Sequence, residues 1–317
     1  MQRVASVTPR GHQVRIAACA IALLAVASPA LAQRAPAPAP ATTLDRIKQT
    51  GQVRLGYRTD ARPFAYQDDA GSASGYSVEL CTRVADAIKA ELGLTTLNVQ
   101  WVPVTLADRF DVVRQGQVDL LCGAASETLA RRAEVDFSIP IFPGGIGALL
   151  RRDASEHLRE ALSGQKPSAP QWRASAYQML QTQTFAVVTG TTAEPWLAGK
   201  VSEFQLTSKV TPVDGYEAGI QAVLDRKADV LFGDRAVLLD AATRPASENK
   251  LAVLDRFFTY EFVALALARN DDAFRLVVDR TLSQLYAGAE FRALYAKWFR
   301  EPDEKVLAFF KWNTLPE

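Results

Sequence analysis

The stretch DVVRQGQVDLLCGAASETLARRAEVDF, from Asp111 to Phe137, contains the local pattern that decides the fold. A helical piece ends at Gly116, and a short apolar run follows from Val118 to Cys122. Small residues then lead to a second helix that opens at Glu127. The pattern predicts a helix, a turn, a strand, a small-residue loop and a helix, in that order.

The small-residue loop from Gly123 to Ser126 is a candidate anion site. Backbone N–H groups at a helix start have no intrahelical partners and attract negative charge. Arg131 stands five residues after Ser126 and can add charge-assisted hydrogen bonds to the same anion. Taken locally, the same residues also describe an ordinary strand–helix joint with a surface arginine, so the rest of the chain has to decide between the two.

The first 32 residues have the pattern of a secretory signal peptide. Three arginines precede an apolar run from Ile16 to Val26, and small residues lead to a predicted cleavage after Ala32. A lipoprotein signal at Cys19 does not fit, because this cysteine stands at the start of the apolar run instead of after it. We therefore expect an exported, periplasmic protein in which residues 33–41 form a flexible, Pro/Ala-rich tether.

Charge and composition exclude several classes of function. Removing the signal peptide removes three arginines and no acidic residue, so the net charge changes from +1 to −2 and offers no basic field for nucleic acid. The remaining histidine, His157, falls in a charged run that is typical of a solvated helix face. A Ser-His-Asp triad, a zinc site rich in histidine or cysteine, and a Gly-rich phosphate loop are therefore not expected. We expect neither a cofactor nor a metal.

Two cysteines remain in the expected mature chain, and exported proteins favour disulfides. Cys81 falls on the apolar face of a predicted helix at 78–92, and Cys122 ends the predicted strand. The two residues either form a disulfide or stay as two separately buried thiols, and the sequence does not choose between these alternatives.

Strands and helices alternate along most of the 317 residues, which predicts two lobes built on mainly parallel sheets. The expected elements of the first series are a strand at 53–57, a helix at 78–92, a strand at 97–104 and a helix at 106–114. A second series contains a strand at 185–188, a helix from 193, a helix at 217–224 and a strand at 228–232. Ligands of such sheets bind beyond the carboxyl ends of the strands.

Two extended apolar runs, at 137–150 and 257–268, connect the two series. A chain that leaves one lobe by one strand and returns by another has a two-strand hinge around a cleft. The expected division is a signal peptide at 1–32, a tether at 33–41, the first lobe at 42–145, the second lobe at 146–259, and a return to the first lobe with C-terminal helices at 260–317.

Several short motifs, taken in their order along the chain, resemble the family-3 solute-binding proteins, which are periplasmic amino-acid-binding proteins of ABC importers. The motifs are Gly56-Tyr57-Arg58, Pro63-Phe64-Ala65-Tyr66, Gly75-Tyr76-Ser77, Asp119 to Gly123, Arg131, Val135 to Ser138, Gly190-Thr191-Thr192, Gly233-Asp234 and Leu294 to Phe299. Each motif is weak alone, but their joint order from 42 to 299 is specific and looks most like the glutamate/aspartate-binding branch. The resemblance implies a type II periplasmic-binding fold and a monomer that closes on an amino acid and delivers it to an inner-membrane ABC permease.

The resemblance also implies roles for individual residues. Arg131 would bind the ligand's α-carboxylate together with Ser126 and the backbone amide of Thr192, and Thr191 belongs to the same motif. Asp234 would bind the α-ammonium group. A zwitterion needs a cation and donors at one end and an anion at the other, because each buried charge has to be matched.

The side-chain end of the ligand would meet another set of residues. In the acidic-amino-acid branch, the arginines that match Arg58 and Arg109 meet the distal carboxylate, and this chain keeps both. Phe64 would either cover the aliphatic part of the ligand or pack in the core.

Three positions depart from the acidic-ligand pattern. Leu106, Ala124 and Tyr216 stand where that branch usually has serine, serine and histidine, and Tyr216 remains a candidate ligand contact. Sites that hydrogen-bond a polar group reject analogues strongly, so such departures can change the ligand. The segment 153–183 looks longer than usual and forms either a lid or a surface excursion.

The sequence leaves two alternatives to a binding protein. Some relatives of this scaffold are exported cyclohexadienyl dehydratases, and such an enzyme needs a positioned acid, for which Asp60 and Glu194 are the candidates near the cleft. A sensor domain is expected to continue into a membrane segment and a signalling module, and the sequence shows neither. We favour a binding protein without catalysis, because Arg131 and Asp234 together suit the two charged groups of an α-amino acid.

Overall fold

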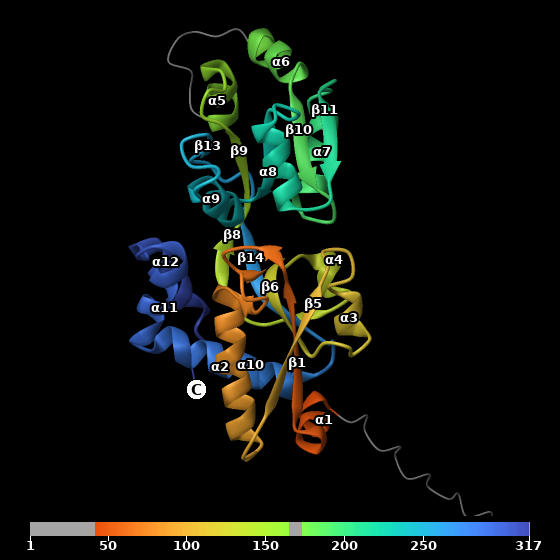
Figure 1. Ribbon diagram of the computed structural model, residues 1–317, viewed down its shortest axis with the longest axis vertical. Coiled ribbons are helices and arrows are strands. Elements are labelled where there is room, and N and C mark those ends of the chain that lie inside the picture. Colours follow the sequence, from red (N-terminus) through yellow and green to blue (C-terminus); the bar gives the residue numbers. More distant parts are fainter. Residues whose placement is uncertain (1–41, 165–172, 317) are drawn as a thin grey trace, which may run out of the picture. The chain divides into compact units, whose positions relative to one another are not determined.

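The computed structural model describes residues 42–164 and 173–316, apart from the side chains of residues 173–176. The predicted signal peptide at 1–32 and the predicted tether at 33–41 lie outside the described residues. Within the described ranges, no helix combines the length and the hydropathy that crossing a bilayer requires. These ranges form two main sheets flanked by helices, as the alternation of strands and helices predicts (Figure 1). A small third sheet, which the alternation did not predict, is also present.

The first main sheet combines strands from the beginning and the end of the chain. Its order is β5 (Asn98–Val104), β1 (Gln52–Arg58), β6 (Leu120–Ser126), β14 (Glu261–Leu267) and β7 (Asp136–Phe137), and β8 (Phe142–Gly144) also pairs with β14. Strand β1 runs parallel to β5 and β6, whereas β14 is antiparallel to its neighbours. Helix α2 (Tyr76–Glu91) packs against β1 and β6, and α10 (Asp272–Ala287) lies beside α2 (Figure 1).

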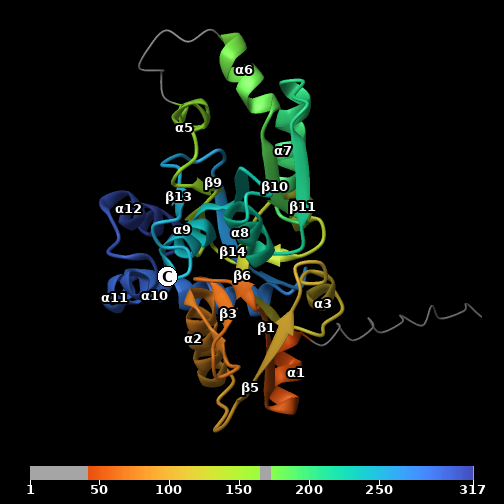
Figure 2. The ribbon, with the colours of Figure 1, turned by 45° about the horizontal axis from the view of Figure 1, so that its top comes forward.

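The second main sheet is built from the middle of the chain. Its order is β11 (Lys209–Val213), β10 (Thr184–Val188), β12 (Val230–Asp234), β9 (Ile146–Arg151) and β13 (Leu251–Val253). Strand β10 is parallel to β11 and β12, whereas β9 is antiparallel to β12 and β13. The helices α7 (Ala193–Glu203) and α8 (Tyr216–Leu224) pack against β10 (Figure 2), and α9 (Arg235–Thr243) follows β12 directly.

Shorter elements complete the described chain. They are α1 (Thr43–Thr50), β2 (Asp60–Ala61), β3 (Ala65–Gln67), β4 (Ala73–Ser74), α3 (Asp111–Arg114), α4 (Leu129–Arg132), α5 (Glu156–Ser163), α6 (Arg173–Gln181), α11 (Glu290–Phe299) and α12 (Glu304–Asn313). The described parts of the long segment at 153–183 thus contain α5 and α6, and α5 buries Leu158 and Leu162 in the core of the second lobe.

The chain passes between the two sheets twice, once between β8 and β9 and once between β13 and β14. The two crossing segments touch, because the Ile146 amide donates to the Thr259 hydroxyl (N to Oγ1, 3.0 Å). Gly145 has a φ of 150°, and a Cβ at this position would lie 2.0 Å from the Thr259 carbonyl oxygen. Only glycine permits this approach. The predicted residue limits of the lobes stay predictions.

One local prediction in the opening stretch is wrong. The residues Gly123 to Ser126 are not a loop, because they continue strand β6, in which Ala125 and Ser126 pair with Ala264 and Val263 of β14. Glycine and alanine have low strand propensity, so the local pattern favoured a loop, but pairing with a distant strand overrides that preference. The following helix starts at Leu129 and not at Glu127, with the Thr128 side chain as its cap.

A disulfide joins Cys81 of α2 to Cys122 of β6. The sequence left this pairing open against two separate thiols. Both residues are fully buried, and the bond ties the helix to the strand beneath it. It closes a sequence separation of 41 residues.

Removing this bond should lower the free energy of unfolding. For a loop of this length, chain entropy predicts a loss of about 4 kcal/mol in the Cys81→Ala/Cys122→Ala variant. Urea unfolding of the oxidised protein, the reduced protein and the variant measures the loss. Equal unfolding midpoints for the oxidised and reduced wild type would show that the bond contributes nothing.

Candidate functional site

Eight of the nine predicted site residues line one small cavity. Its walls come from the first lobe, from the second lobe and from the two crossing segments. The lining residues are Arg58, Leu106, Arg109, Ala124, Ser126, Arg131, Gly145, Ile146, Thr191, Thr192, Tyr216, Asp234 and Glu261. The cavity volume is about 20 Å³, which is close to the space that a single water molecule needs. A larger ligand can therefore enter only if the walls separate or side chains move.

Arg131 is a partly buried cation held by backbone oxygens. The Thr128 hydroxyl accepts a hydrogen bond from its amide (3.2 Å), which fixes the start of α4. The guanidinium donates from Nη1 to the Ser126 carbonyl (2.7 Å) and from Nη2 to the Gly190 carbonyl (3.3 Å). Within the described residues it forms no ion pair. Burial lowers its pKa, because a desolvated cation is less stable than a hydrated one.

Arg109 is a second arginine on the wall of this cavity, and it is buried. Its Nη2 donates to the Gly190 carbonyl (3.0 Å), and its Nη1 donates to the Leu106 carbonyl. Burial, together with the nearby charges of Arg131 and Arg58, lowers its pKa to about 9. Two guanidinium groups of the first lobe thus share one carbonyl of the second lobe. An anion placed between them would satisfy both charges better than that carbonyl does.

Arg58 ends β1 and differs from the other two arginines. It is buried, and it donates to Oδ1 of Asp60 from Nε (2.9 Å) and from Nη2 (2.6 Å). Its guanidinium also lies 5.8 Å from the centre of the Tyr216 ring, within the range of cation–π contact.

Asp234 is the acid that the sequence placed opposite the arginines. Its Oδ1 caps α9 by accepting from the amides of Ala236 (2.9 Å) and Val237 (3.3 Å), and its own amide donates to the Tyr216 hydroxyl (3.1 Å). Burial raises its pKa to about 6 despite these hydrogen bonds, and the charge of Glu261 adds to the rise. The carboxylate therefore gains from any cation that enters the cavity.

Glu261 is the functional candidate that the sequence reasoning missed. It opens β14, and its two oxygens accept from the hydroxyls of Thr192 (2.7 Å) and Thr259 (2.7 Å). The signal in the sequence was an acidic residue between two aromatic residues at the start of an apolar run, Tyr260-Glu261-Phe262. Three guanidinium groups and two carboxylates therefore line the cavity.

Two hydroxyl residues of the Gly-Thr-Thr motif stand at the start of α7. Thr192 is the N-cap residue, so the free N–H groups of the first helical turn lie beside it. The Thr191 hydroxyl donates to the Val188 carbonyl (2.7 Å), which ties the motif to the end of β10.

Phe64 is the predicted site residue that the structure does not bring to the cavity. It is fully buried in the core of the first lobe. Its ring centre lies 5.1 Å from that of Phe142 and 5.3 Å from that of Phe299. Of its two predicted roles, core packing is therefore the one that the structure shows.

The acids proposed for an enzyme do not line the cavity. Asp60 is bound to Arg58, and Glu194 accepts a hydrogen bond from the Gly190 amide (2.8 Å). His157 is exposed on α5, as the charged run around it predicts. The described residues contain no group of three or more His, Cys, Asp or Glu side chains that could hold a metal ion.

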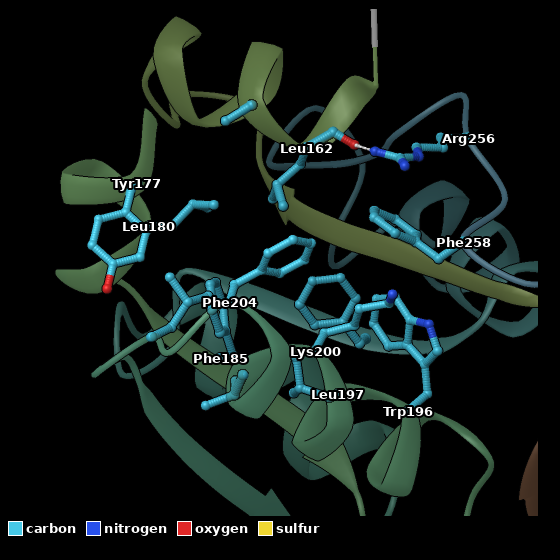
Figure 3. A pocket seen from close by; sticks show the side chains of 14 residues that line it. Leu162, Tyr177, Leu180, Phe185, Trp196, Leu197, Lys200, Phe204, Arg256 and Phe258 are labelled. Carbon is cyan, nitrogen blue, oxygen red and sulfur yellow. Dashed lines mark hydrogen bonds between the residues drawn. The ribbon is translucent and has the colours of Figure 1, made fainter. Parts of the chain in front are cut away.

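A much larger cavity, of about 830 Å³, lies within the second lobe (Figure 3). Its walls are mainly apolar side chains from α5, α6, α7, β10 and β12. Arg256 donates to the Leu162 carbonyl there (2.9 Å), and Lys200 is paired with Glu203 (2.6 Å). None of the described residues that line this cavity is an acid, so they do not provide the paired charges that an amino acid requires.

The chain matches known proteins over most of its length. The family model of bacterial extracellular solute-binding proteins, family 3, matches residues 53–301. The L-glutamate/L-aspartate-binding protein of Pseudomonas aeruginosa is 27% identical over 261 residues, which cover 82% of this chain and 80% of that protein. A glutamate/aspartate import solute-binding protein of Escherichia coli is 23% identical over 290 residues, covering 92% and 90%.

A solved structure agrees with the fold. The crystal structure of an ancestral amino acid-binding protein, a precursor of cyclohexadienyl dehydratase, superposes with a TM-score of 0.65 and 24% identity. The match covers 82% of this chain and all of the other. The predicted two-lobed, type II periplasmic-binding fold is thereby confirmed. Because the family model spans well over half of the sequence, this chain belongs to the bacterial extracellular solute-binding proteins of family 3.

Proposed function

We propose that this protein is the extracytoplasmic substrate-binding component of an ABC importer and that it binds an acidic α-amino acid, glutamate or aspartate, in the small cavity. The observation that carries the proposal is the placement of Arg131 and Asp234 on the walls of one cavity. Among the described residues, the Arg131 guanidinium donates hydrogen bonds to carbonyl oxygens and to no carboxylate, and Asp234 is a carboxylate that burial disfavours. An α-carboxylate and an α-ammonium group supply the two missing counter-charges.

The charge of the cavity supports an acidic ligand. Three arginines and two acids line it, so the lining residues carry one positive charge in excess, which the Asp60 carboxylate bound to Arg58 offsets only from outside the lining. Glutamate and aspartate each carry one net negative charge at neutral pH, which is opposite to the charge of the lining residues. Buried charges are costly unless they are matched, and a neutral amino acid would leave the excess unmatched.

The side-chain carboxylate would meet Arg58 and Arg109. Leu106 and Ala124 line the same cavity but offer no hydroxyl groups, so the two guanidinium groups would be the main donors to this carboxylate. The named functions of the Pseudomonas and Escherichia relatives agree with this ligand class.

Closure of the lobes follows from the same contacts. The Gly190 carbonyl of the second lobe accepts from Arg109 and Arg131 of the first, and a ligand carboxylate would replace it as their partner. We propose that the ligand stabilises a closed form by bonding to both lobes, with the hinge at the two crossing segments. A permease could then recognise the closed form.

Binding, and not catalysis, is the function that the cavity favours. The two acids considered for a dehydratase already have partners and do not line the cavity. Asp234 is held by the first turn of α9, as suits a fixed counter-charge for an ammonium group.

Thermal unfolding in the presence of each of the twenty amino acids tests the proposal. Glutamate and aspartate should raise the melting temperature, since a ligand that binds only the folded state adds about 2.7 kcal/mol at 100 times its Kd. Stabilisation by neutral or basic amino acids alone would contradict the acidic specificity and leave amino-acid binding intact. Stabilisation by none of them would contradict the proposed function.

A further inference from the structure

We propose that Asp60 sets the charge selectivity of the site, because its carboxylate is bound to Arg58 and weakens the preference for a distal carboxylate over a distal carboxamide. The inference rests on the proposed amino-acid site. It concerns which side-chain ends that site accepts, and Asp60 itself is not among the residues that line the cavity.

Asp60 gives Arg58 a partner that the other two cavity arginines lack. Within the described residues, Arg109 and Arg131 bond to carbonyl oxygens, whereas Arg58 forms an ion pair with Asp60. The pair is held firmly, since Arg58 is the last residue of β1 and Asp60 belongs to β2, where it pairs with Tyr66 of β3. The carboxylate is therefore built into the edge of the site.

The ion pair leaves some N–H donors of Arg58 free for a ligand, but the Asp60 carboxylate offsets the positive charge of Arg58. A guanidinium group has five N–H donors, and Asp60 occupies donors on Nε and Nη2 only. Nη1 of Arg58 remains able to meet a ligand. A distal carboxylate that bonds there has the Asp60 carboxylate as a near neighbour of the same sign, which disfavours it. A carboxamide carries no charge and avoids this repulsion.

The second oxygen of Asp60 faces the other lobe. A Cβ built on Gly215, the residue before α8, would lie 3.1 Å from Oδ2 of Asp60. Gly215 is the N-cap of α8 and provides no side-chain cap, so the positive end of this helix lies beside the carboxylate. Asp60 thus has favourable partners in both lobes.

The Asp60→Asn variant separates charge from position. Asparagine has the same shape and still accepts a hydrogen bond from Arg58 through Oδ1, but it carries no charge. Calorimetric titration with glutamate and with glutamine, at neutral pH and constant salt, gives the ratio of the two Kd values. We expect the preference for glutamate over glutamine to rise about tenfold in Asp60→Asn. Asp60→Ser serves as a second uncharged variant.

The Asp153→Asn variant is the matched control. Asp153 also pairs with an arginine, Arg226, but it belongs to the second lobe and does not line the cavity. The same change of net charge there should leave the ratio unaltered. A general effect of net charge would raise the ratio in both variants and would overturn the inference.

Two further outcomes decide the remaining cases. If Asp60 only positions Arg58, Asp60→Asn leaves the ratio unchanged while Asp60→Ala weakens glutamate binding, and the inference is wrong. If all Asp60 variants still bind amino acids with an unchanged ratio of the Kd values for glutamate and glutamine, the inference is wrong and the proposed function stands. Failure of the wild type to bind any amino acid overturns the proposed function together with it.

Discussion

Replacing Arg131 with alanine should abolish amino-acid binding and leave the fold intact. If this guanidinium binds the α-carboxylate, its loss leaves a buried carboxylate without its counter-charge, which costs about 2–5 kcal/mol. The affinity should therefore fall on the order of 10³-fold. The folded protein should not suffer, because Arg131 forms no ion pair within the described residues and burial already disfavours its charge. Calorimetric titration and thermal unfolding measure the two effects separately.

The neighbouring residue offers a matched control. Arg132 belongs to the same four-residue helix, but its side chain is half exposed and pairs with Glu127 (3.1 Å) outside the cavity. Arg132→Ala should keep the wild-type affinity within about twofold, as expected for an exposed pair. Unchanged affinity in Arg131→Ala, or equal losses in both variants, would place the carboxylate elsewhere.

The architecture was predictable from the sequence because it depends on local periodicity. Strands and helices with strong patterns were found within a few residues of their observed ends, and α2 (Tyr76–Glu91) lies close to the helix expected at 78–92. The helix expected at 106–114 shrinks to α3 (Asp111–Arg114). Thr105, just before this range, and Asp108 within it bond through their side chains to each other's backbone amides and form a turn instead.

Long-range pairing is what the sequence could not show. The small residues after Cys122 carry no strand signal of their own, and they become strand only because β14 returns from more than a hundred residues away to pair with them. The β14 residues themselves looked like a simple extended run. Which strand they would join depends on the packing of both lobes, and no local pattern encodes this.

The candidate site was predictable at positions where the residue type allows only one role in a ligand site. Buried arginines near the carboxyl ends of strands have few roles besides anion binding, and all three line the cavity. The sequence suited Phe64 equally well to ligand contact and to core packing. Its contacts with Phe142 and Phe299 show that it packs in the core. Glu261 was missed because its position in the cavity depends on where the returning strand enters the first lobe.

The raised pKa of Asp234 makes the free energy of unfolding depend strongly on pH. Its pKa in the folded protein is about 6, above the ordinary value of 3.8, so the folded state binds an extra proton between these values. This contribution to stability is fully present below about pH 3.8 and is lost as the pH rises through 6. Above pH 6 the ligand-free protein therefore carries a cost of about 3 kcal/mol.

The Asp234→Asn variant should be free of this cost. Asparagine caps helices as well as aspartate does, so the hydrogen bonds to Ala236 and Val237 can persist. We expect the ligand-free variant to unfold at a higher urea concentration than the wild type at pH 8, and the difference should shrink as the pH falls towards 4. A constant difference across this range would show that Asp234 is not the titrating group.

Ligand binding should have the opposite dependence on pH. The α-ammonium group needs the ionised form of Asp234, so binding displaces the proton, and the affinity of the wild type should fall by up to tenfold for each pH unit below 6. Asp234→Asn should bind the amino acid poorly at every pH, since the ammonium group would be buried without a counter-charge. Titrations at pH 5, 6, 7 and 8 compare the two proteins. Affinity that is independent of pH in the wild type would remove Asp234 from the ammonium site, because no bound cation could then be competing with its proton.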